Sequence, residues 1–506
     1  MGKQNRQDVH SASGHQLYWG DIHNHNAVGY AKGSLGRTIE IAREHLDFFA
    51  FTGHAYWHDM PIMPGDRHMV WVNGSKVHSA HWDKTRKMVE EANDEGFVSM
   101  IGYEWHSSTY GDFCLIFPKD QPNLYLPDNV KDLFDFARNE NALAIPHHVG
   151  YKLGWRGANW SVFDPSVTPV VEIFSEHGCT ETDRSHIPMI LHSNGGCAYS
   201  NSLEYNLKKG LRFGFVASTD DHFGYPGAYG EGLVAIWSDG LSKESIFEAI
   251  RNRRTYAVTG DRIMVDFMIN GNPMGSELPA SDKRDVTIDV VGEDAVQVVE
   301  LIKNGKIVHR AYPDELSHER TTDFKEAKCR IQYGWGPWAA LDLARTCNWD
   351  MDIEILGGRL KKVERCFQAG PYEETLRDKL TWIDDRHLHL ESFTSRKNAY
   401  LENPTKSIIL SLEGDASTRI KVKLTKPHSV ERTVTLEQLV GDNDITFTDV
   451  FTSESFVMHR LVFPFEYEVH TEWTDTSKDL NPGDWYYVRV RELNGQMAWS
   501  SPIWVG

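Results

Sequence analysis

Apolar and polar residues follow two different patterns along the chain, and the change falls near residue 259. Before it, short apolar runs alternate with segments whose apolar residues recur at helical spacing. The runs predict buried strands at 18–22, 46–52, 97–103, 113–117, 142–146, 170–174 and 212–218. Helices are expected between them at 36–45, 82–92, 130–139, 203–209 and 242–253. This alternation of strand and helix favours a parallel sheet closed into a barrel.

Two local features of this half can be checked directly against a structure. The segment 55–79 is rich in His, Trp, Met and Pro, and we expect a long loop there. Loops of that length in compact domains are usually functional or mobile. Ser242 is expected to cap the N-terminus of the helix that closes this half.

The second half consists of short stretches of alternating apolar and polar residues, as in half-buried strands. Asn304-Gly305 and Asn494-Gly495 stand between such stretches, and Asn-Gly is a strong hairpin signal. We therefore expect an α/β barrel domain over 1–258 and a mostly-β, sandwich-like domain over 259–506.

Length, net charge and cysteine spacing limit the number of domains and the classes of partner that the chain is expected to have. The 506 residues are too many for one ordinary core, and the formal charge of −19 argues against nucleic acid or an anionic membrane as partner. The polar first ten residues lack the apolar core of a signal peptide, and the six cysteines show no CxxC spacing. We expect a cytoplasmic protein with reduced thiols and a small-molecule substrate; whether it forms a homo-oligomer stays open.

Metal-ligand side chains stand at the ends of successive predicted strands. In an extended strand, His23 and His25 point to the same side, so this His-x-His pair can hold one ion. Each ligand alone has an ordinary alternative, such as a loop histidine or a turn-capping aspartate. Together they predict a site for Zn, Mn or Fe, in which a carboxylate can bridge two ions. The set is His23, His25, His54, Glu104, His147, Asp220 and His222.

These residues carry a family resemblance. Gly-Asp-Ile-His-Asn-His, Phe-Thr-Gly-His, Gly-Tyr-Glu-Trp, Ile-Pro-His and Ser-Thr-Asp-Asp-His, in that order, resemble the polymerase-and-histidinol-phosphatase (PHP) superfamily. Within it the chain is similar to a stand-alone class with a β-rich C-terminal half, catalogued as a domain of unknown function. The stretches at 253–260 and 497–503 carry that second likeness. The resemblance implies a distorted seven-stranded β/α barrel, two or three divalent metal ions and hydrolysis of phosphoesters.

The resemblance also implies a role for each ligand. His23, His25, Glu104 and Asp220 would hold the first metal ion. Glu104 would bridge to a second ion that His147 also binds, and His54 with His222 would bind a third.

The chain departs from the family pattern at three positions. Ala31 stands where an Asp or His ligand is usual, Gly53 replaces the Asp of Thr-Asp-His, and Asp112 stands where relatives often carry a His. The change at Ala31 puts the third ion in question. A neighbouring histidine could supply a missing ligand; the choices are His58, His68, His78, His81 and His106.

The expected activity is hydrolysis of a phosphoester of a small organic molecule by a metal-activated water. His177 or His222 would pass a proton to the leaving group. Lys152, Arg156 and Arg184 would bind phosphate oxygens or a carboxylate. Two alternatives stay open: hydrolysis of a carboxylic ester, lactone or amide, and a degenerate metal-binding scaffold without catalysis.

Overall fold

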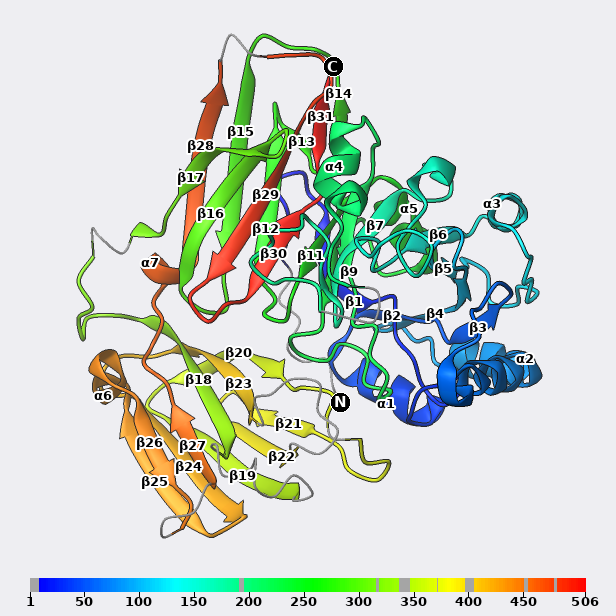
Figure 1. Ribbon diagram of the computed structural model, residues 1–506. Coiled ribbons are helices and arrows are strands. Elements are labelled where there is room, and N and C mark those ends of the chain that lie inside the picture. Colours follow the sequence, from blue (N-terminus) through cyan, green and yellow to red (C-terminus); the bar gives the residue numbers. More distant parts are fainter. Residues whose placement is uncertain are drawn as a thin grey trace.

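The structure is a computed structural model that describes residues 9–190, 195–314, 318–335, 346–370, 372–395, 405–449, 454–476 and 480–506. An α/β region from the first half of the chain lies beside two β-rich groups from the second half (Figure 1). Residues 1–8, part of the segment examined for a signal peptide, lie outside the described residues. Across the described chain, no helix combines the length and apolar character needed to cross a membrane.

The α/β region is built on a mixed sheet whose strands are buried on both faces. In hydrogen-bonded order the strands are β11 (Thr255–Val258), β10 (Leu233–Ser238), β1 (Gln16–Asp21), β2 (Phe48–Phe51), β4 (Val98–His106), β5 (Phe113–Ile116) and β6 (Leu143–Pro146). β3 (His54–Trp57) pairs with the end of β4. β7 (Val170–Ser175) pairs with β8 (Gly178–Cys179) and β9 (Gly214–Ala217) in a separate sheet.

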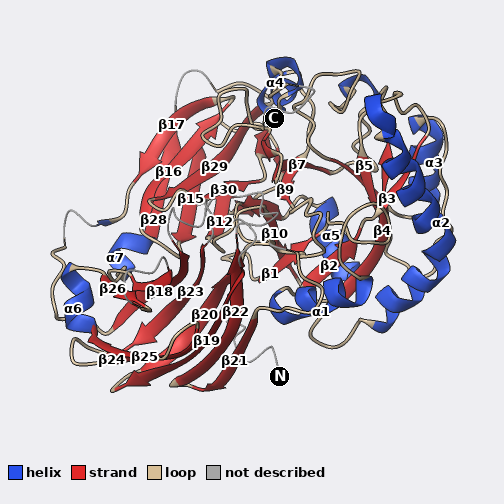
Figure 2. Ribbon diagram, turned by 60° about the horizontal axis from the view of Figure 1, so that its bottom comes forward, coloured by secondary structure: helices blue, strands red, loops and turns tan. Residues whose placement is uncertain are grey.

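Helices lie along the outside of this region (Figure 2). They are α1 (Leu35–His45), α2 (His68–Glu91), α3 (Val130–Asn139), α4 (Leu203–Lys208) and α5 (Lys243–Arg251). Short 3-10 turns occur at η1 (Pro64–Asp66), η2 (Trp160–Val162) and η3 (Tyr199–Asn201). The predicted cap of α5 is confirmed, because the Ser242 side chain accepts a hydrogen bond from the backbone N–H of Ser245.

Two expectations for this region are wrong. The sheet is not all parallel, since β10 runs antiparallel to β1 and β5 runs antiparallel to β4 and β6. Only a short connection without a helix joins β4 to β5, and such a link suits an antiparallel pair. The predicted loop 55–79 contains β3 and the first half of α2, whose buried face is formed there by Gly74, Ser75 and His78. Because these buried residues are small or polar, the sequence there lacks the recurring apolar residues by which a helix is predicted.

A closed barrel is not confirmed. The main ladder ends at β6, and β7 and β9 form a ladder of their own. β7 lies next to β6, and β9 lies next to β10 and β11, so the two ladders are neighbours without a described hydrogen-bonded closure.

The first β-rich group is a sandwich that continues the main sheet. One layer contains β14 (Glu277–Leu278), β16 (Val296–Lys303), β17 (Lys306–Ala311), β29 (Asp484–Glu492), β30 (Met497–Ser500) and β31 (Ile503–Val505). The facing layer contains β12 (Met264–Ile269), β13 (Asn272–Pro273), β15 (Arg284–Val291) and β28 (Glu468–Asp475). The hairpin signals are confirmed, because β16 pairs with β17 and β29 with β30. Since β30 also pairs with β11, one sheet crosses residue 258, and the domain division there stays a prediction.

The second β-rich group packs two five-stranded sheets around one apolar core that includes Ile331, Trp349 and Leu410. One sheet contains β18 (Glu326–Trp335), β20 (Arg359–Cys366), β23 (Thr405–Glu413), β26 (Asp444–Phe447) and β27 (Glu454–Met458). The other contains β19 (Thr346–Leu356), β21 (Lys379–Asp384), β22 (His387–Ser395), β24 (Arg419–Lys426) and β25 (Val430–Thr435). Two short helices complete the group, α6 (Leu436–Gly441) and α7 (Pro464–Tyr467).

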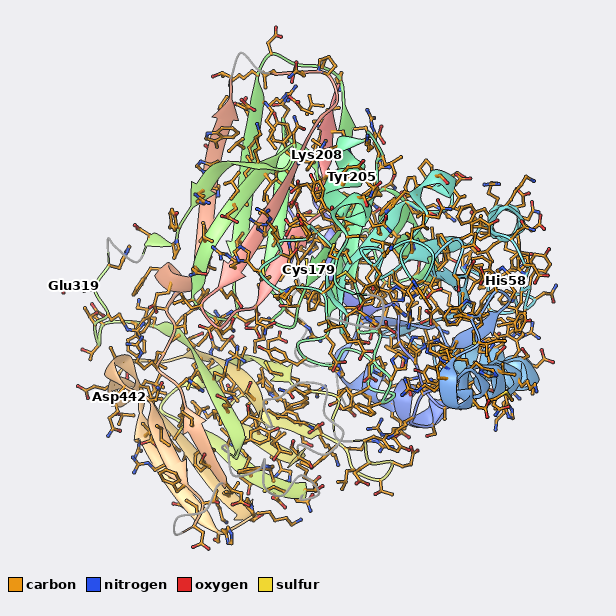
Figure 3. All side chains as sticks on the ribbon, in the orientation of Figure 1. His58, Cys179, Tyr205, Lys208, Glu319 and Asp442 are labelled. Atoms are coloured by element: carbon orange, nitrogen blue, oxygen red, sulfur yellow. The ribbon has the colours of Figure 1, made fainter. Side chains whose placement is uncertain are left out.

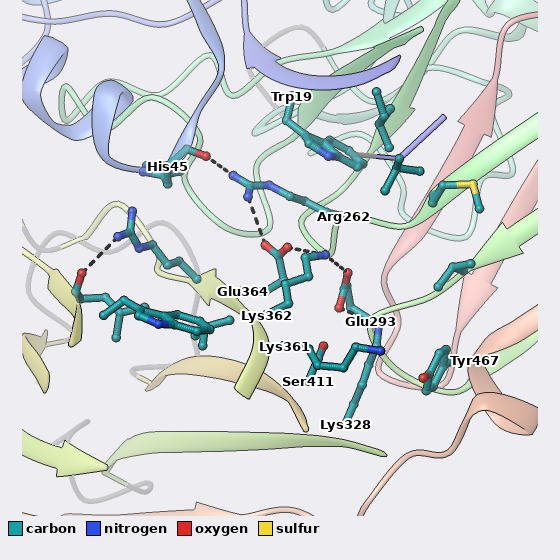
Figure 4. A pocket seen from close by; sticks show the side chains of 18 of the residues that line it. Trp19, His45, Arg262, Glu293, Lys328, Lys361, Lys362, Glu364, Ser411 and Tyr467 are labelled. Carbon is teal, nitrogen blue, oxygen red and sulfur yellow. Dashed lines mark hydrogen bonds and ion pairs between the residues drawn. The ribbon is translucent and has the colours of Figure 1, made fainter. Parts of the chain in front are cut away.

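A cavity of about 410 Å³ lies where the three parts meet. Across it, Lys362 lies between Glu293 and Glu364, and Arg262 joins Glu364 to the backbone carbonyl of His45 (Figure 4). None of the predicted metal ligands lines this cavity.

Candidate metal centre

The strand ends bring the predicted ligands together. His23 and His25 follow β1, and Asp220 follows β9; the Asp220 N–H donates to the His23 carbonyl over 2.8 Å, and the His25 N–H donates to the Asp221 carbonyl over 2.9 Å. His54 lies opposite Glu104 in the β3–β4 ladder. We call the seven predicted residues the ligand cluster. Its members are all buried except His222, whose side chain is 15% exposed.

The two carboxylates of the cluster lie between imidazoles. Asp220 Oδ1 lies 2.9 Å from His25 Nε2 and 3.2 Å from His23 Nε2. Glu104 Oε2 lies 2.7 Å from His54 Nδ1, and Glu104 Oε1 lies 2.7 Å from His147 Nε2. The two oxygens of Glu104 therefore face different histidines, which is the arrangement of a bridging carboxylate.

The donor atoms fit divalent metal ions better than they fit each other. His23 Nε2 lies 3.2 Å from His25 Nε2, and His54 Nε2 lies 3.0 Å from His222 Nε2. Within the described chain, Glu104 Oε2, His147 Nε2 and Asp220 Oδ2 are buried and make no hydrogen bond of good geometry, although each lies within 3.3 Å of a neighbouring side-chain nitrogen or oxygen. Unpaired buried polar atoms are costly, so their convergence indicates a ligand that they share.

Hydrogen bonds behind the cluster orient its rings. Glu172 Oε2 lies 2.9 Å from His23 Nδ1, and Glu176 Oε1 lies 3.1 Å from His222 Nδ1. Cys114 Sγ lies 3.6 Å from His147 Nδ1. In each case the Nδ1 partner leaves Nε2 facing the cluster, as in many metal-binding histidines.

In the metal-free site, neighbouring charges hold the carboxylates ionised and divide the histidines. Burial opposes protonation of His23, His147 and His222, yet the carboxylates of Asp220, Glu104 and Glu176 raise the pKa values of these rings, to about 10 for His147 and about 9 for His222, so metal binding would displace their protons. Burial would raise the pKa of Glu104, but the charges of His106, His54 and His147 outweigh it and hold that pKa well below its usual range. Burial also opposes ionisation of Asp220, yet His23 and other neighbouring histidines hold its pKa low. Burial, followed by the charge of His222, lowers the pKa of His25 to about 3. Ionised carboxylates and a neutral imidazole are the forms that bind metals.

The expected proton carriers both belong to this site. His177 Nε2 lies 3.3 Å from Asp220 Oδ2, and its Nδ1 is hydrogen-bonded to Tyr151 Oη over 2.8 Å. His222 has its Nε2 inside the cluster and its Nδ1 against Glu176, an arrangement that suits the ligand role predicted for it.

Of the three predicted anion-binding residues, one lies at the site. Arg156 Nη2 lies 3.1 Å from His148 Nε2 and 3.6 Å from Asp112 Oδ2. Its guanidinium also stacks 5.7 Å from the Trp71 ring. Lys152 and Arg184 are exposed, and the described residues show no ion pair from either to the cluster.

One departure from the family pattern, Gly53, has a structural explanation. A Cβ at Gly53 would lie against the Val28 carbonyl oxygen and 2.5 Å from Phe51 Cζ, so an aspartate does not fit there. His106 and Asp112 are instead brought to the site. His106 Nε2 lies 3.0 Å from His54 Nδ1, and Asp112 belongs to a compact donor group with Glu104, His147 and His148.

Other histidines near the predicted loop have different surroundings. His58, labelled in Figure 3, directly follows β3, and its ring packs 5.5 Å from the Trp105 ring. His78 is buried between Phe51 and Trp82, and His81 is exposed.

Sequence reasoning missed the supporting residues Glu172 and Cys114 and the neighbouring His148. A signal for Glu172 existed: it is the single charged residue in the fully buried strand β7. Cys114 and His148 carried no comparable signal, since a buried cysteine or a second histidine is common without a metal.

Two comparisons with known proteins find similarity to a family and to proteins without an assigned function. A family model described as "Protein of unknown function (DUF3604)" matches residues 227–287, which include the stretch 253–260. An uncharacterised protein of Chlamydia muridarum is 33% identical over 355 residues, which are 64% of this chain and 54% of that protein. One from Chlamydia pneumoniae is 29% identical over 256 residues, 46% of this chain and 41% of that protein. The chain thus spans about half the length of the curated relatives it matches.

A solved structure from Bacteroides vulgatus was also found. It is a two-domain protein containing a predicted PHP-like metal-dependent phosphoesterase, 13% identical, and the match covers 86% of this chain and 99% of that one. Its TM-score of 0.35 is too low to establish a shared fold. The case for a metal centre therefore depends on the geometry of the ligand cluster.

Proposed function

We propose that this protein is a metal-dependent hydrolase that acts on a phosphoester of a small organic molecule. The observation that carries the proposal is the convergence of buried imidazole nitrogens and carboxylate oxygens, several of which make no hydrogen bond of good geometry. A scaffold without metal has no physical reason to collect these groups, because burying them unpaired costs stability.

The ligand cluster divides into overlapping sets. His23, His25 and Asp220 form one group, and His25, His54 and His222 form another. Glu104 adjoins both and also faces His147. This mixture of nitrogen and oxygen donors suits Zn, Mn or Fe, and Glu104 would be a ligand shared by two ions. Ions held there would supply an activated water and neutralise charge on the ester.

Residues around the cluster provide the remaining functions. In this proposal Arg156 binds a phosphate oxygen; the position of its guanidinium beside His148 and Asp112, at the edge of the donors, supports that role. His177 gives a proton to the leaving oxygen as the phosphorus–oxygen bond breaks and water adds. Tyr151 fixes the His177 ring through its Nδ1.

Hydrolysis of a carboxylic ester, lactone or amide is the second candidate. Ala31 and Gly53 stand where the phosphoesterase pattern has acidic or histidine residues, and Gly53 has no room for a side chain. A smaller complement of metal ions would suit a carbonyl substrate with less negative charge than a phosphoester.

Elemental analysis of wild type and His23→Ala/His25→Ala tests the proposal. We expect at least two equivalents of Zn, Mn or Fe in wild type, a clear reduction in the double variant, and metal-dependent turnover of an aryl phosphate. His387→Ala, at an exposed pair with Asp384, is the matched control and should keep its metal. Wild type with less than half an equivalent, unrestored by added metal, would refute the metal centre. Full metal content with turnover of aryl esters alone would favour the second candidate.

A further inference from the structure

The segment that carries two of the ligands is anchored in the second β-rich group. We call residues 218–229, which follow β9 and include Asp220 and His222, the ligand loop. Phe223, Tyr225 and Ala228 of this loop are buried in the same apolar cluster as the core of the β18–β27 sheets. The core of that group therefore extends into the loop.

Hydrogen bonds inside the ligand loop couple its anchored end to the ligands. Asp221 Oδ2 accepts the backbone N–H groups of Tyr225 over 2.6 Å and Phe223 over 3.0 Å. Asp220 has a left-handed backbone with φ 56°, which is uncommon for a non-glycine residue and ties the turn to one shape. The position of Tyr225 thus helps to define where His222 lies.

The Tyr225 side chain reaches a buried ion pair in the β-rich group. Its Oη donates to Asp378 Oδ2 over 2.8 Å. The Asp378 side chain is fully buried and is held by Lys406 Nζ at 2.7 Å and Ser392 Oγ at 2.5 Å. A second link joins the same parts, because the Tyr229 N–H donates to the Phe367 carbonyl over 2.8 Å.

We propose that Asp378 is a positioning residue for the metal centre: it holds Tyr225, and through Tyr225 it fixes the ligand loop that presents Asp220 and His222. This inference rests on the proposed function. It gives the β-rich half a role in the chemistry of the α/β region, although Asp378 touches neither metal ligands nor substrate.

A pair of conservative substitutions separates positioning from general stability. Tyr225→Phe keeps the buried ring and removes the donor to Asp378. Tyr333→Phe is the matched control, because Tyr333 Oη donates over 2.8 Å to Ser392 on the far side of Asp378, and among the described residues its hydroxyl makes no hydrogen bond to the ligand loop. Both variants lose one buried hydrogen bond of the same network.

Two measurements on the full chain decide the matter. Release of Zn²⁺ from zinc-loaded protein into excess EDTA should be about tenfold faster for Tyr225→Phe than for Tyr333→Phe, the range seen when a partner of a metal ligand is lost. Amide hydrogen exchange of 218–229 in metal-free protein should be faster in Tyr225→Phe alone. Equal zinc release and equal exchange in the two variants would overturn the inference. Wild type that binds no Zn²⁺ would refute the proposed function, and the exchange comparison would still decide whether Asp378 positions the loop.

Discussion

His78 is a buried histidine outside the ligand cluster, and it supplies a quantitative test of the structure. Its ring stacks on Phe51 at 5.9 Å and lies tilted against Trp82 at 5.4 Å, and neither ring nitrogen has a hydrogen-bond partner among the described residues. Burial, followed by the charge of His106, lowers the pKa of His78 to about 3. The imidazole is therefore neutral in the folded protein over the ordinary pH range.

The size of the effect follows from linkage. In the unfolded chain a histidine titrates near a pKa of about 6.5. Below that pH the unfolded state binds a proton that the folded state does not, so the stability of the folded protein falls as pH falls toward the folded pKa. At pH 5 the loss is about 2 kcal/mol, from ~1.5 pH units at ~1.36 kcal/mol each, and at pH 7.5 it is close to zero.

The substitution His78→Phe removes this loss and keeps an aromatic ring between the same neighbours. We expect the free energy of unfolding of the metal-free variant, relative to that of wild type, to be about 2 kcal/mol larger at pH 5 than at pH 7.5, so the variant is relatively more stable at pH 5. Urea denaturation, monitored by tryptophan fluorescence, measures the unfolding free energy of each protein at each pH. Subtracting the wild-type value from the variant value removes the contributions of the other titrating groups, which both proteins share. His81→Gln, exposed on the same helix, should follow wild type at both pH values. A constant difference between His78→Phe and wild type would show that His78 is not buried in the neutral form, and the reasoning would be wrong.

Three further predictions concern the site and its surroundings. Glu104→Gln should lower metal content more than loss of any single histidine, because Glu104 faces histidines with both oxygens; elemental analysis checks this. Gly53→Ala should destabilise the protein by about 1–3 kcal/mol, because the added Cβ would be overpacked against Val28 and Phe51. The control is Gly36→Ala on α1, where the space around an added Cβ is open; this variant should be neutral or stabilising. Thermal unfolding measures both effects. Arg156→Met should raise KM for an aryl phosphate at least tenfold with unchanged metal content, and an unchanged KM would remove Arg156 from substrate binding.

The sequence alone determined the features that depend on local chemistry. The strand runs, the Ser242 cap and both Asn-Gly hairpins were predicted, because side-chain alternation, capping and turn conformation depend on a few neighbouring residues. The donor types of the ligand cluster were also visible, since His-x-His and strand-end carboxylates are recognisable without a partner.

Only the tertiary structure decided which distant residues meet. The pairing of β10 with β1, the ring-orienting Glu172 and Cys114, and the link from Tyr225 to Asp378 all join segments far apart in the chain. The second half of α2 was predicted, but its first half was not, because the buried positions there are glycine, serine and histidine, which show a helical period only against the surface they cover. Strand direction and long-range hydrogen bonds follow from the packing of the whole chain, and local residue patterns carry no record of that packing.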